Sequence, residues 1–144
     1  MIDFFEQFKK KLTYGKLLQA LWSDIDIQKA IVELNTKDQL FNKGIDSEGD
    51  TLGNYSPVSV ANYGKPAGHI RLFETGDFYK SFKVQREGED FTIIADTMKT
   101  SDTGQLTDLA TVYGIDIIGL TNDSKKVLSQ MVKSKIPSKI RGML

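Results

Sequence analysis

The stretch SFKVQREGEDFTIIADT, residues 81–97, alternates apolar and polar side chains on both sides of a short charged turn. The apolar positions are Phe82, Val84, Phe91, Ile93 and Ala95, and the turn at residues 87–90 contains a glycine. A two-residue alternation across such a turn is typical of an antiparallel β-hairpin. We therefore expect a small antiparallel sheet in the middle of the chain.

The sequence before this hairpin has the spacing of helices. Residues 1–22 place apolar side chains on one helical face and charged ones on the other, with Gly15 as an interruption. A second helix is expected to begin after Ser23 or Asp24, which can cap its first turn, and to end at Gly44. The apolar face of the first segment is Phe4, Phe5, Phe8, Leu12, Leu17, Leu18, Leu21 and Trp22, and the stripe of the second helix is Ile27, Ile31, Leu34 and Phe41.

The segment HIRLFETGDFYKSFKV, residues 69–84, leads into the hairpin. Ile70 and Leu72 alternate with polar neighbours, which predicts a short strand. Thr75 or Asp77 can then cap a single helical turn. The side chains expected to face inward from that turn are Phe78, Tyr79 and Phe82.

After the hairpin, residues 98–108 are polar and are expected to be exposed. The segment LATVYGIDIIGLTND, residues 109–123, is equally compatible with a short helical turn ending at Tyr113 and with a strand. Thr121 is a good N-cap for a final helix, and Pro137 is expected to end or kink it. Its predicted buried stripe is Val127, Leu128, Met131 and Val132, with Lys135 and Ile136 as a further candidate pair.

These segments together predict an α+β fold, in which N-terminal helices and a C-terminal helix pack on a small antiparallel sheet. The length of 144 residues suits one domain. Within it we distinguish an amphipathic helical segment at 1–22, a core at 23–136 and a basic tail at 137–144.

A long connection without sustained periodicity, residues 44–70, contains five glycines. Connections of this length usually carry function or pack against a neighbouring molecule. Its first part, KGIDSEGDTLGNYSP at residues 43–57, places Asp46, Glu48 and Asp50 at alternate positions. Such a spacing raises the question of a metal site.

An EF-hand calcium loop that began at Asp46 would need glycine at its sixth position and glutamate at its twelfth. Those positions hold Thr51 and Pro57, so the pattern fails twice. Side-chain-to-backbone turns explain the same residues more simply. A metal-dependent enzyme that uses Asp46, Glu48, Asp50 and His69 remains an alternative, but we expect no catalytic residues, metal or cofactor.

The composition excludes several chemistries. The chain has no cysteine and one histidine, which excludes disulfides, thiolate sites and His-rich zinc sites. No run of about 18 apolar residues is present, so we expect no membrane span. The start of the sequence does not have the pattern of a secretory signal, and cytoplasmic synthesis is expected.

The net charge is zero, but residues 125–144 hold six basic residues and no acid. Cations near a helix C-terminus are favoured by the helix dipole, which accounts for Lys133 and Lys135. Lys139 and Arg141 follow Pro137, where this explanation weakens. They suit a contact with nucleic acid, or with the acidic stretches of a second copy in a head-to-tail arrangement.

The order of these features resembles small phage virion proteins of the virion-morphogenesis or tail-completion type. The resemblance covers about residues 27–132 and rests on QLFNKGIDSEGDTLGNYSP, LFETGDFYKSFKV, FTIIADT and YGIDIIGLTND. The residues that carry its motif are Gly44, Asp46, Gly49, Leu72, Thr75, Gly76, Phe78 and Tyr79.

This resemblance implies a non-enzymatic structural component of the virion, made in the host cytoplasm. Such proteins form homo-oligomeric rings in the neck or upper tail, next to portal, adaptor or tail proteins. Nucleic acid is not expected as a specific ligand, although a small nucleic-acid-binding module remains an alternative. The candidate subunit-interface residues are Phe4, Phe5, Phe8, Asp46, Glu48, Asp50, Lys135, Lys139 and Arg141.

Overall fold

The computed structural model describes residues 14–64, 67–100 and 104–143. The predicted helix around Phe4, Phe5 and Phe8 lies outside these residues. The helices are α2 (Tyr14–Trp22), α3 (Ile25–Glu33), the π-helical η1 (Leu34–Lys43), α4 (Pro57–Tyr63), α5 (Asp77–Lys80), α6 (Leu109–Tyr113), the 3-10 turn η2 (Ile115–Ile117) and α7 (Asn122–Met143). The strands are β1 (Lys83–Glu87), β2 (Asp90–Ile94), β3 (Met98–Thr100) and β4 (Leu106–Asp108).

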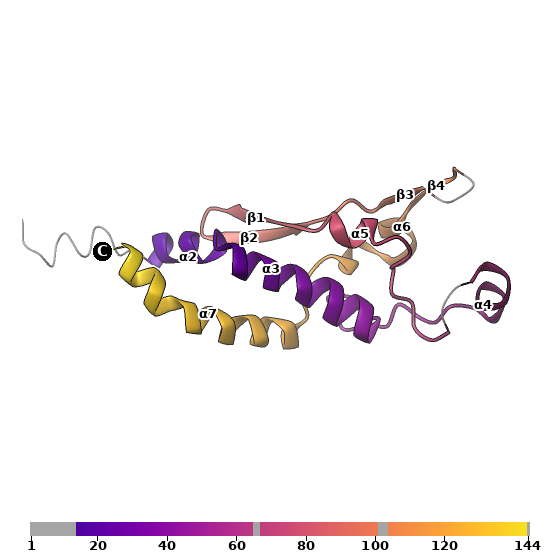
Figure 1. The fold of residues 1–144 in the computed structure, drawn as a ribbon, viewed down its shortest axis with the longest axis horizontal. Coiled ribbons are helices and arrows are strands. Elements are labelled where there is room, and N and C mark those ends of the chain that lie inside the picture. The colour runs from indigo at the N-terminus through magenta and orange to yellow at the C-terminus, as the bar shows by residue number, and fades with distance from the viewer. Residues whose placement is uncertain (1–13, 65–66, 101–103, 144) are drawn as a thin grey trace, which may run out of the picture.

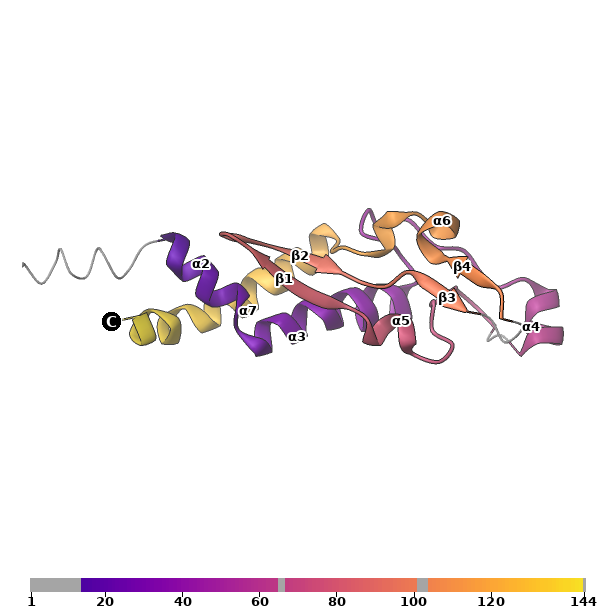
Figure 2. The same cartoon turned by 90° about the horizontal axis from the view of Figure 1, so that it is seen from above.

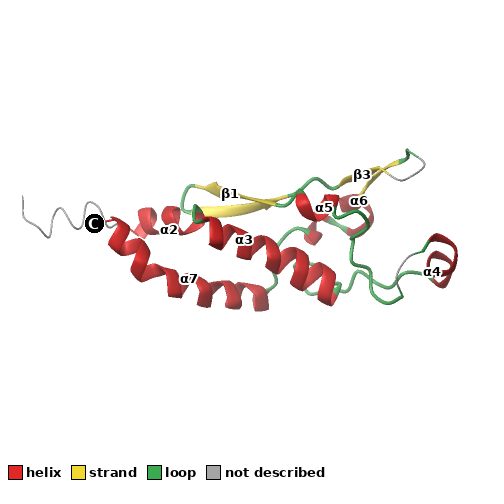
Figure 3. Cartoon of the chain, viewed as in Figure 1, coloured by secondary structure: helices red, strands yellow, loops and turns green. Residues whose placement is uncertain are grey.

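The molecule is elongated, and α3 with η1 forms its central rod (Figure 1). The β1–β2 hairpin lies on one side of α3 and α7 on the other, while α2 contacts both α7 and β2. Figure 3 shows the strands gathered along one side of the helices. The predicted α+β class is therefore confirmed.

The hairpin predicted from residues 81–97 is present. Strands β1 and β2 are antiparallel, with Val84 opposite Ile93 and Glu87 opposite Asp90. A second hairpin, β3–β4, pairs Met98 with Asp108 and Thr100 with Leu106. This segment was expected only to be polar and exposed, because three-residue strands are too short to show an alternation.

The second helix begins and ends as predicted. The Asp24 carboxylate accepts a hydrogen bond from the Ile27 backbone N–H at 3.0 Å, and Gly44 takes the left-handed conformation at the C-cap. The expected burial of Phe41 is wrong, because this side chain is 38% exposed. Its helix changes from α to π geometry at Leu34, and the altered angular spacing turns polar residues inward instead.

The long connection is less irregular than predicted, because residues 57–63 form α4. The Ser56 hydroxyl accepts from the Ser59 N–H at 3.1 Å, Pro57 occupies the first turn, and Gly64 ends the helix. Figures 1 and 2 show α4 projecting from the body at the end opposite the last turn of α7.

Ile70 and Leu72 are buried, but they do not form the predicted strand. Asn54 and His69 form an isolated bridge there, and Leu72 adopts a positive φ of 56° that ends the extended run. In the following turn, the Thr75 hydroxyl accepts from the Asp77 N–H at 3.3 Å, and α5 buries Phe78. The prediction that this helical turn directs aromatic side chains inward is therefore confirmed, whereas residues 69–72 do not form the strand predicted before it.

The C-terminal region confirms some expectations and corrects others. Residues 109–113 are helical, which resolves the open choice between helix and strand. Thr121 does cap α7, by accepting from the Ser124 N–H at 3.1 Å, and Leu128 is buried, but Val127 and Met131 are exposed. Helix α7 continues through Pro137 to Met143, so the residues after Pro137 are not a tail.

Two clusters of buried side chains form the core. One lies between α2, α3 and α7, and the other between η1, α5 and η2; Ile93 of β2 packs against both. The first consists of Leu21, Ile27, Ile31, Leu120 and Leu128. The second consists of Leu40, Ile70, Leu72, Phe78, Phe82, Leu109 and Ile117.

Candidate functional site

The acidic corner of residues 46–50 is held together by its own backbone. The Asp46 carboxylate accepts hydrogen bonds from the Glu48 and Asp50 N–H groups at 2.9 and 3.0 Å. The Asp46 N–H donates to the Asp50 carbonyl at 2.9 Å. This is the side-chain-to-backbone turn that the sequence favoured. One carboxylate oxygen of Asp46 accepts both of the side-chain hydrogen bonds within the loop.

The same corner packs on the segment before α7. The Ser47 N–H donates to the Asp116 carbonyl at 2.8 Å. A Cβ placed on Gly119 would lie only 3.0 Å from the Ser47 Cβ, so glycine allows this close approach. The corner is therefore a fixed part of the fold.

His69 is tied to the end of η1. Its Nε2–H donates to the Phe41 carbonyl at 2.7 Å, and a Cβ on Gly44 would lie 2.5 Å from the His69 ring. Within residues 14–64, 67–100 and 104–143, no three His, Cys, Asp or Glu side chains are grouped to hold a metal ion. The described residues thus do not assemble the metal-site alternative built on Asp46, Glu48, Asp50 and His69.

The buried side-chain amides of Asn35 and Gln39 in η1 form hydrogen bonds with the backbone of residues 117–121. Asn35 donates to the Ile117 carbonyl at 3.0 Å and accepts from the Gly119 N–H at 2.7 Å. Gln39 donates to the Gly119 carbonyl at 2.8 Å and accepts from the Thr121 N–H at 2.9 Å. The two side chains imitate the bonding of a neighbouring β-strand. Sequence reasoning missed them, although their i, i+4 spacing in an otherwise apolar stripe was a visible signal.

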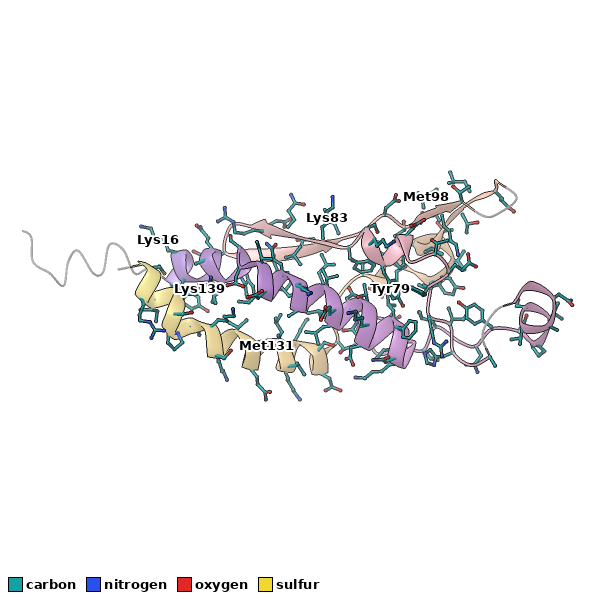
Figure 4. The ribbon with its side chains drawn as sticks, in the orientation of Figure 1. Lys16, Tyr79, Lys83, Met98, Met131 and Lys139 are labelled. Atoms are coloured by element: carbon teal, nitrogen blue, oxygen red, sulfur yellow. The ribbon has the colours of Figure 1, made fainter. Side chains whose placement is uncertain are left out.

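The basic residues of α7 contact acids of the same chain. Lys139 lies 2.6 Å from the Asp24 carboxylate, and Lys135 lies 3.2 Å from the carboxylate of Asp26. Asp24 has a side chain only 11% exposed, and its hydrogen bond with Lys139 lowers the pKa of its carboxyl below the usual value. Figure 4 shows Lys139 on the last turns of α7. The assignment of Lys135, Lys139 and Arg141 to a subunit interface stays a prediction, and two of these cations already have partners.

Five residues of the family-like motif, Leu72, Thr75, Gly76, Phe78 and Tyr79, lie in α5 or just before it, whereas Gly44, Asp46 and Gly49 lie at the end of η1 and in the acidic corner. Leu72, Gly76 and Phe78 are buried, and Phe78 packs edge-on against Phe82. The Tyr79 hydroxyl donates to the Arg71 carbonyl, and burial raises the pKa of Tyr79 above its usual value. These contacts are structural, because they hold α5 against the loop that precedes it, at Arg71, and against Phe82 at the start of the β1–β2 hairpin.

An apolar groove opens between α3–η1 and α5–β1, with a volume of about 860 Å³. We define it by its apolar lining residues: Ile25, Val32, Phe73, Tyr79, Phe82 and Val84. Ile25 is 79% exposed and Phe73 is 44% exposed, so large apolar side chains meet solvent at both ends. Lysines 29, 37, 80 and 83 also line the groove, and Figure 4 shows Tyr79 and Lys83 on the two segments that face α3–η1.

The end of the molecule opposite the last turn of α7 exposes further apolar side chains. Val58 of α4, Met98 of β3 and Leu106 of β4 are all exposed, and α4 and the β3–β4 hairpin project there (Figure 2). We call these two projecting elements the arm end. Large apolar side chains that are exposed on projecting elements are candidates for an interaction site.

A second depression, also about 860 Å³, lies between the acidic corner, β2 and the start of α7. Its charged lining is mixed, with Glu48, Asp90 and Asp123 beside Lys43 and Lys125. The acids and bases are interspersed, so this depression does not select a ligand by its charge.

We found no match for this chain among protein-family models, curated proteins or solved structures. Among the described residues, no helix is both long and apolar enough to cross a membrane. The arrangement of the apolar groove and the arm end is therefore the main structural guide to function.

Proposed function

We propose that this chain is a non-enzymatic structural component of a phage particle, which forms a homo-oligomeric ring in the neck or upper tail during virion assembly. The observation that carries the proposal is the exposure of apolar side chains on two separate surfaces, the apolar groove and the arm end. A single folded chain leaves both uncovered within its described residues. Contacts between copies would remove this surface from water.

The two surfaces differ in shape, since one is a groove and the other consists of projecting elements. A contact that joins two different surfaces is heterologous, and heterologous contacts produce a closed ring when the rotation between copies closes. This geometry supports a ring over a two-fold dimer. The order of motifs around Gly44 and Gly76, which resembles the virion-morphogenesis type, supports the location in a phage particle.

The partners in this proposal are copies of the same chain and the neighbouring portal, adaptor or tail proteins of the virion. The chain is made in the host cytoplasm and ends in the particle. No cofactor is assigned. The nucleic-acid-binding alternative has less support, because Lys135 and Lys139 already pair with Asp26 and Asp24.

Electron microscopy of intact virions tests the proposal. The expected result is a ring of density in the neck or upper tail, into which copies of α3–η1, α7 and the β1–β2 hairpin fit. Particles purified from a phage that lacks the gene should lack this ring and fail to join head to tail. Virions in which no density accommodates this fold would refute the proposal.

A further inference from the structure

Helix α7 divides its basic residues between two opposite faces. Two of them, Lys135 and Lys139, pair with acids at the start of α3. Three others, Lys126, Lys133 and Arg141, are exposed, and within the described residues no ion pair involves them. We call these three residues the basic stripe.

The basic stripe follows one side of α7. Its members are seven and eight residues apart, which in a regular helix corresponds to about 10 and 12 Å along the axis and to a sector of about 80° around it. Lys135 and Lys139 lie on the opposite side, about 180° from the middle of that sector. Helix α7 forms the edge of the molecule opposite the β1–β2 hairpin (Figure 1), so the basic stripe faces solvent.

The helix dipole does not explain this arrangement. The dipole favours cations only near the last turn of a helix and disfavours them near the first. Because α7 continues through Pro137 to Met143, Lys133 lies ten residues before its end, and Lys126 lies in its second turn. Of the three cations, only Arg141 belongs to the last turn.

The surface of the basic stripe carries one sign of charge. The sequence contains no acid from Lys125 to Met143, and Asp123 precedes the stripe at its N-terminal end. Ser129 and Gln130 lie between the first two cations and are exposed. The stripe therefore combines cations with polar side chains that can donate hydrogen bonds.

We propose that the basic stripe binds the phosphate backbone of nucleic acid, independently of base sequence. Basic, hydroxyl and amide side chains are the groups that contact phosphates, and such contacts carry no sequence information. The stripe spans about 22 Å, over which one strand of B-DNA presents about six phosphates. Three cations spaced along this length can therefore each meet a different phosphate.

An acidic protein surface is the competing partner, and the composition of the stripe argues against it. Protein interfaces are built around an apolar core with a polar rim. The exposed apolar side chains of this part of α7, Val127 and Met131, lie about 100° and 140° around the helix from Lys126. They border the basic stripe on one side and leave its centre polar.

This inference goes beyond the proposed function and does not depend on it. It makes no use of Lys135 and Lys139, whose pairing weakens the alternative of a nucleic-acid-binding module. The contact is instead a sequence-independent one, made by the cations that the fold leaves without acidic partners on the outer face of α7.

Titration of a labelled DNA duplex of about 30 base pairs with the full-length protein tests the inference, at salt concentrations of about 50 and 200 mM. Fluorescence anisotropy reports the binding. If the three cations neutralise three phosphates, the affinity should fall about 40-fold between the two salt concentrations. The triple variant Lys126→Gln, Lys133→Gln, Arg141→Gln should bind about tenfold or more weakly at the lower one.

Two further triple variants serve as controls. Lys126→Arg, Lys133→Arg, Arg141→Lys keeps every charge of the stripe and should keep the affinity. Lys29→Gln, Lys80→Gln, Lys83→Gln removes the same total charge from the apolar groove and should change the affinity less than about threefold, because the stripe remains intact. Circular dichroism checks that all three variants are folded.

An equal loss of affinity in the stripe and groove variants overturns the inference, because net charge alone would then explain the binding. A duplex that does not bind at the lower salt concentration overturns it as well. The third contrary result is a stripe variant with a changed oligomeric mass in analytical ultracentrifugation and an unchanged affinity for DNA. The stripe would then contact an acidic surface of another copy.

The outcome is separable from that of the proposed function. If virions show the ring and the protein does not bind DNA, the proposed function stands and this contact is wrong. If the stripe binds DNA and virions show no such ring, the contact stands and the proposed function fails.

Discussion

Asn35 and Gln39 lie one helical turn apart in η1, and their amides together form four hydrogen bonds with backbone groups of residues 117, 119 and 121. Both side chains are fully buried. Each amide satisfies one backbone donor and one backbone acceptor of this segment, and the bonds to the Ile117 carbonyl and the Thr121 N–H are buried. The link between η1 and the start of α7 therefore depends on two polar side chains as well as on apolar packing.

Replacing Gln39 with alanine should destabilise the protein by about 2 to 5 kcal/mol, because it leaves the buried Thr121 N–H and the half-buried Gly119 carbonyl without this partner and opens a cavity. Chemical denaturation measures the loss, and hydrogen exchange of the Thr121 amide should become faster. Gln130→Ala on the exposed face of α7 is the control and should change stability little. Equal stability of the two variants would contradict the role of the amide.

Gly44 and Gly49 allow a matched comparison of a clash with backbone strain. Both have a positive φ, 63° and 84°, so alanine at either position should cost about 1 to 2 kcal/mol. A Cβ at Gly49 meets nothing within 4 Å, whereas one at Gly44 lies 2.5 Å from the His69 ring. Gly44→Ala should therefore cost about 1 to 3 kcal/mol more than Gly49→Ala. Thermal denaturation checks the difference, and similar melting temperatures would show that His69 moves away freely.

Asp24 should make stability depend on pH in the acidic range. Its hydrogen bond with Lys139 holds its folded pKa below the ordinary value of 3.8, so the stabilisation is complete above that value and is lost as the pH falls through the folded pKa. Asp24→Asn keeps an N-cap for α3 but removes the charge. The free energy of unfolding of the wild type should thus exceed that of Asp24→Asn by a constant amount near neutral pH, and this difference should shrink below about pH 4.

Denaturation of both proteins across this pH range provides the measurement for Asp24. Asp26→Asn is the control, because it removes a pair with Lys135 whose carboxylate partner is 79% exposed and should cost at most about 1 kcal/mol. If the difference in the free energy of unfolding between the wild type and Asp24→Asn stays constant at low pH, the Asp24–Lys139 pair does not stabilise the fold.

The acidic corner should behave as a structural turn. Asp46→Asn retains a side-chain acceptor for the Glu48 and Asp50 N–H groups and should be nearly neutral, while Asp46→Ala should cost about 1 kcal/mol. Adding calcium, magnesium or manganese should leave the melting temperature unchanged. A rise in melting temperature that Asp46→Asn abolishes would revive the metal-site alternative.

Local sequence signals predicted much of the fold. The alternation around Gly88 specified the β1–β2 hairpin, and Asp24, Gly44 and Thr121 were recognised as helix caps. These signals work because a turn or a cap depends on the few residues next to it. Of the predicted interface residues, the acidic corner and the basic residues of α7 have definite places in the fold, and the phenylalanines lie outside the described residues.

The errors share one cause, which is that burial depends on what approaches from elsewhere in the chain. Phe41 has the spacing of a buried stripe, yet the π geometry of η1 turns Asn35 and Gln39 inward to meet residues 117–121. Pro137 was expected to end or kink the last helix and to be followed by a tail, yet α7 continues through it to Met143, with Lys135 and Lys139 on either side paired with Asp26 and Asp24. No pattern within η1 or α7 alone contains this information.

The sequence by itself determined the fold class, the positions of the turns and the caps, and the exclusion of cysteine chemistry, because each depends on composition or on neighbouring residues. The apolar groove was decided only by tertiary structure. Its walls come from α3–η1 and from α5–β1, which lie about 50 residues apart in the chain. Side chains so distant in sequence form one surface only after the hairpin has packed on the helix.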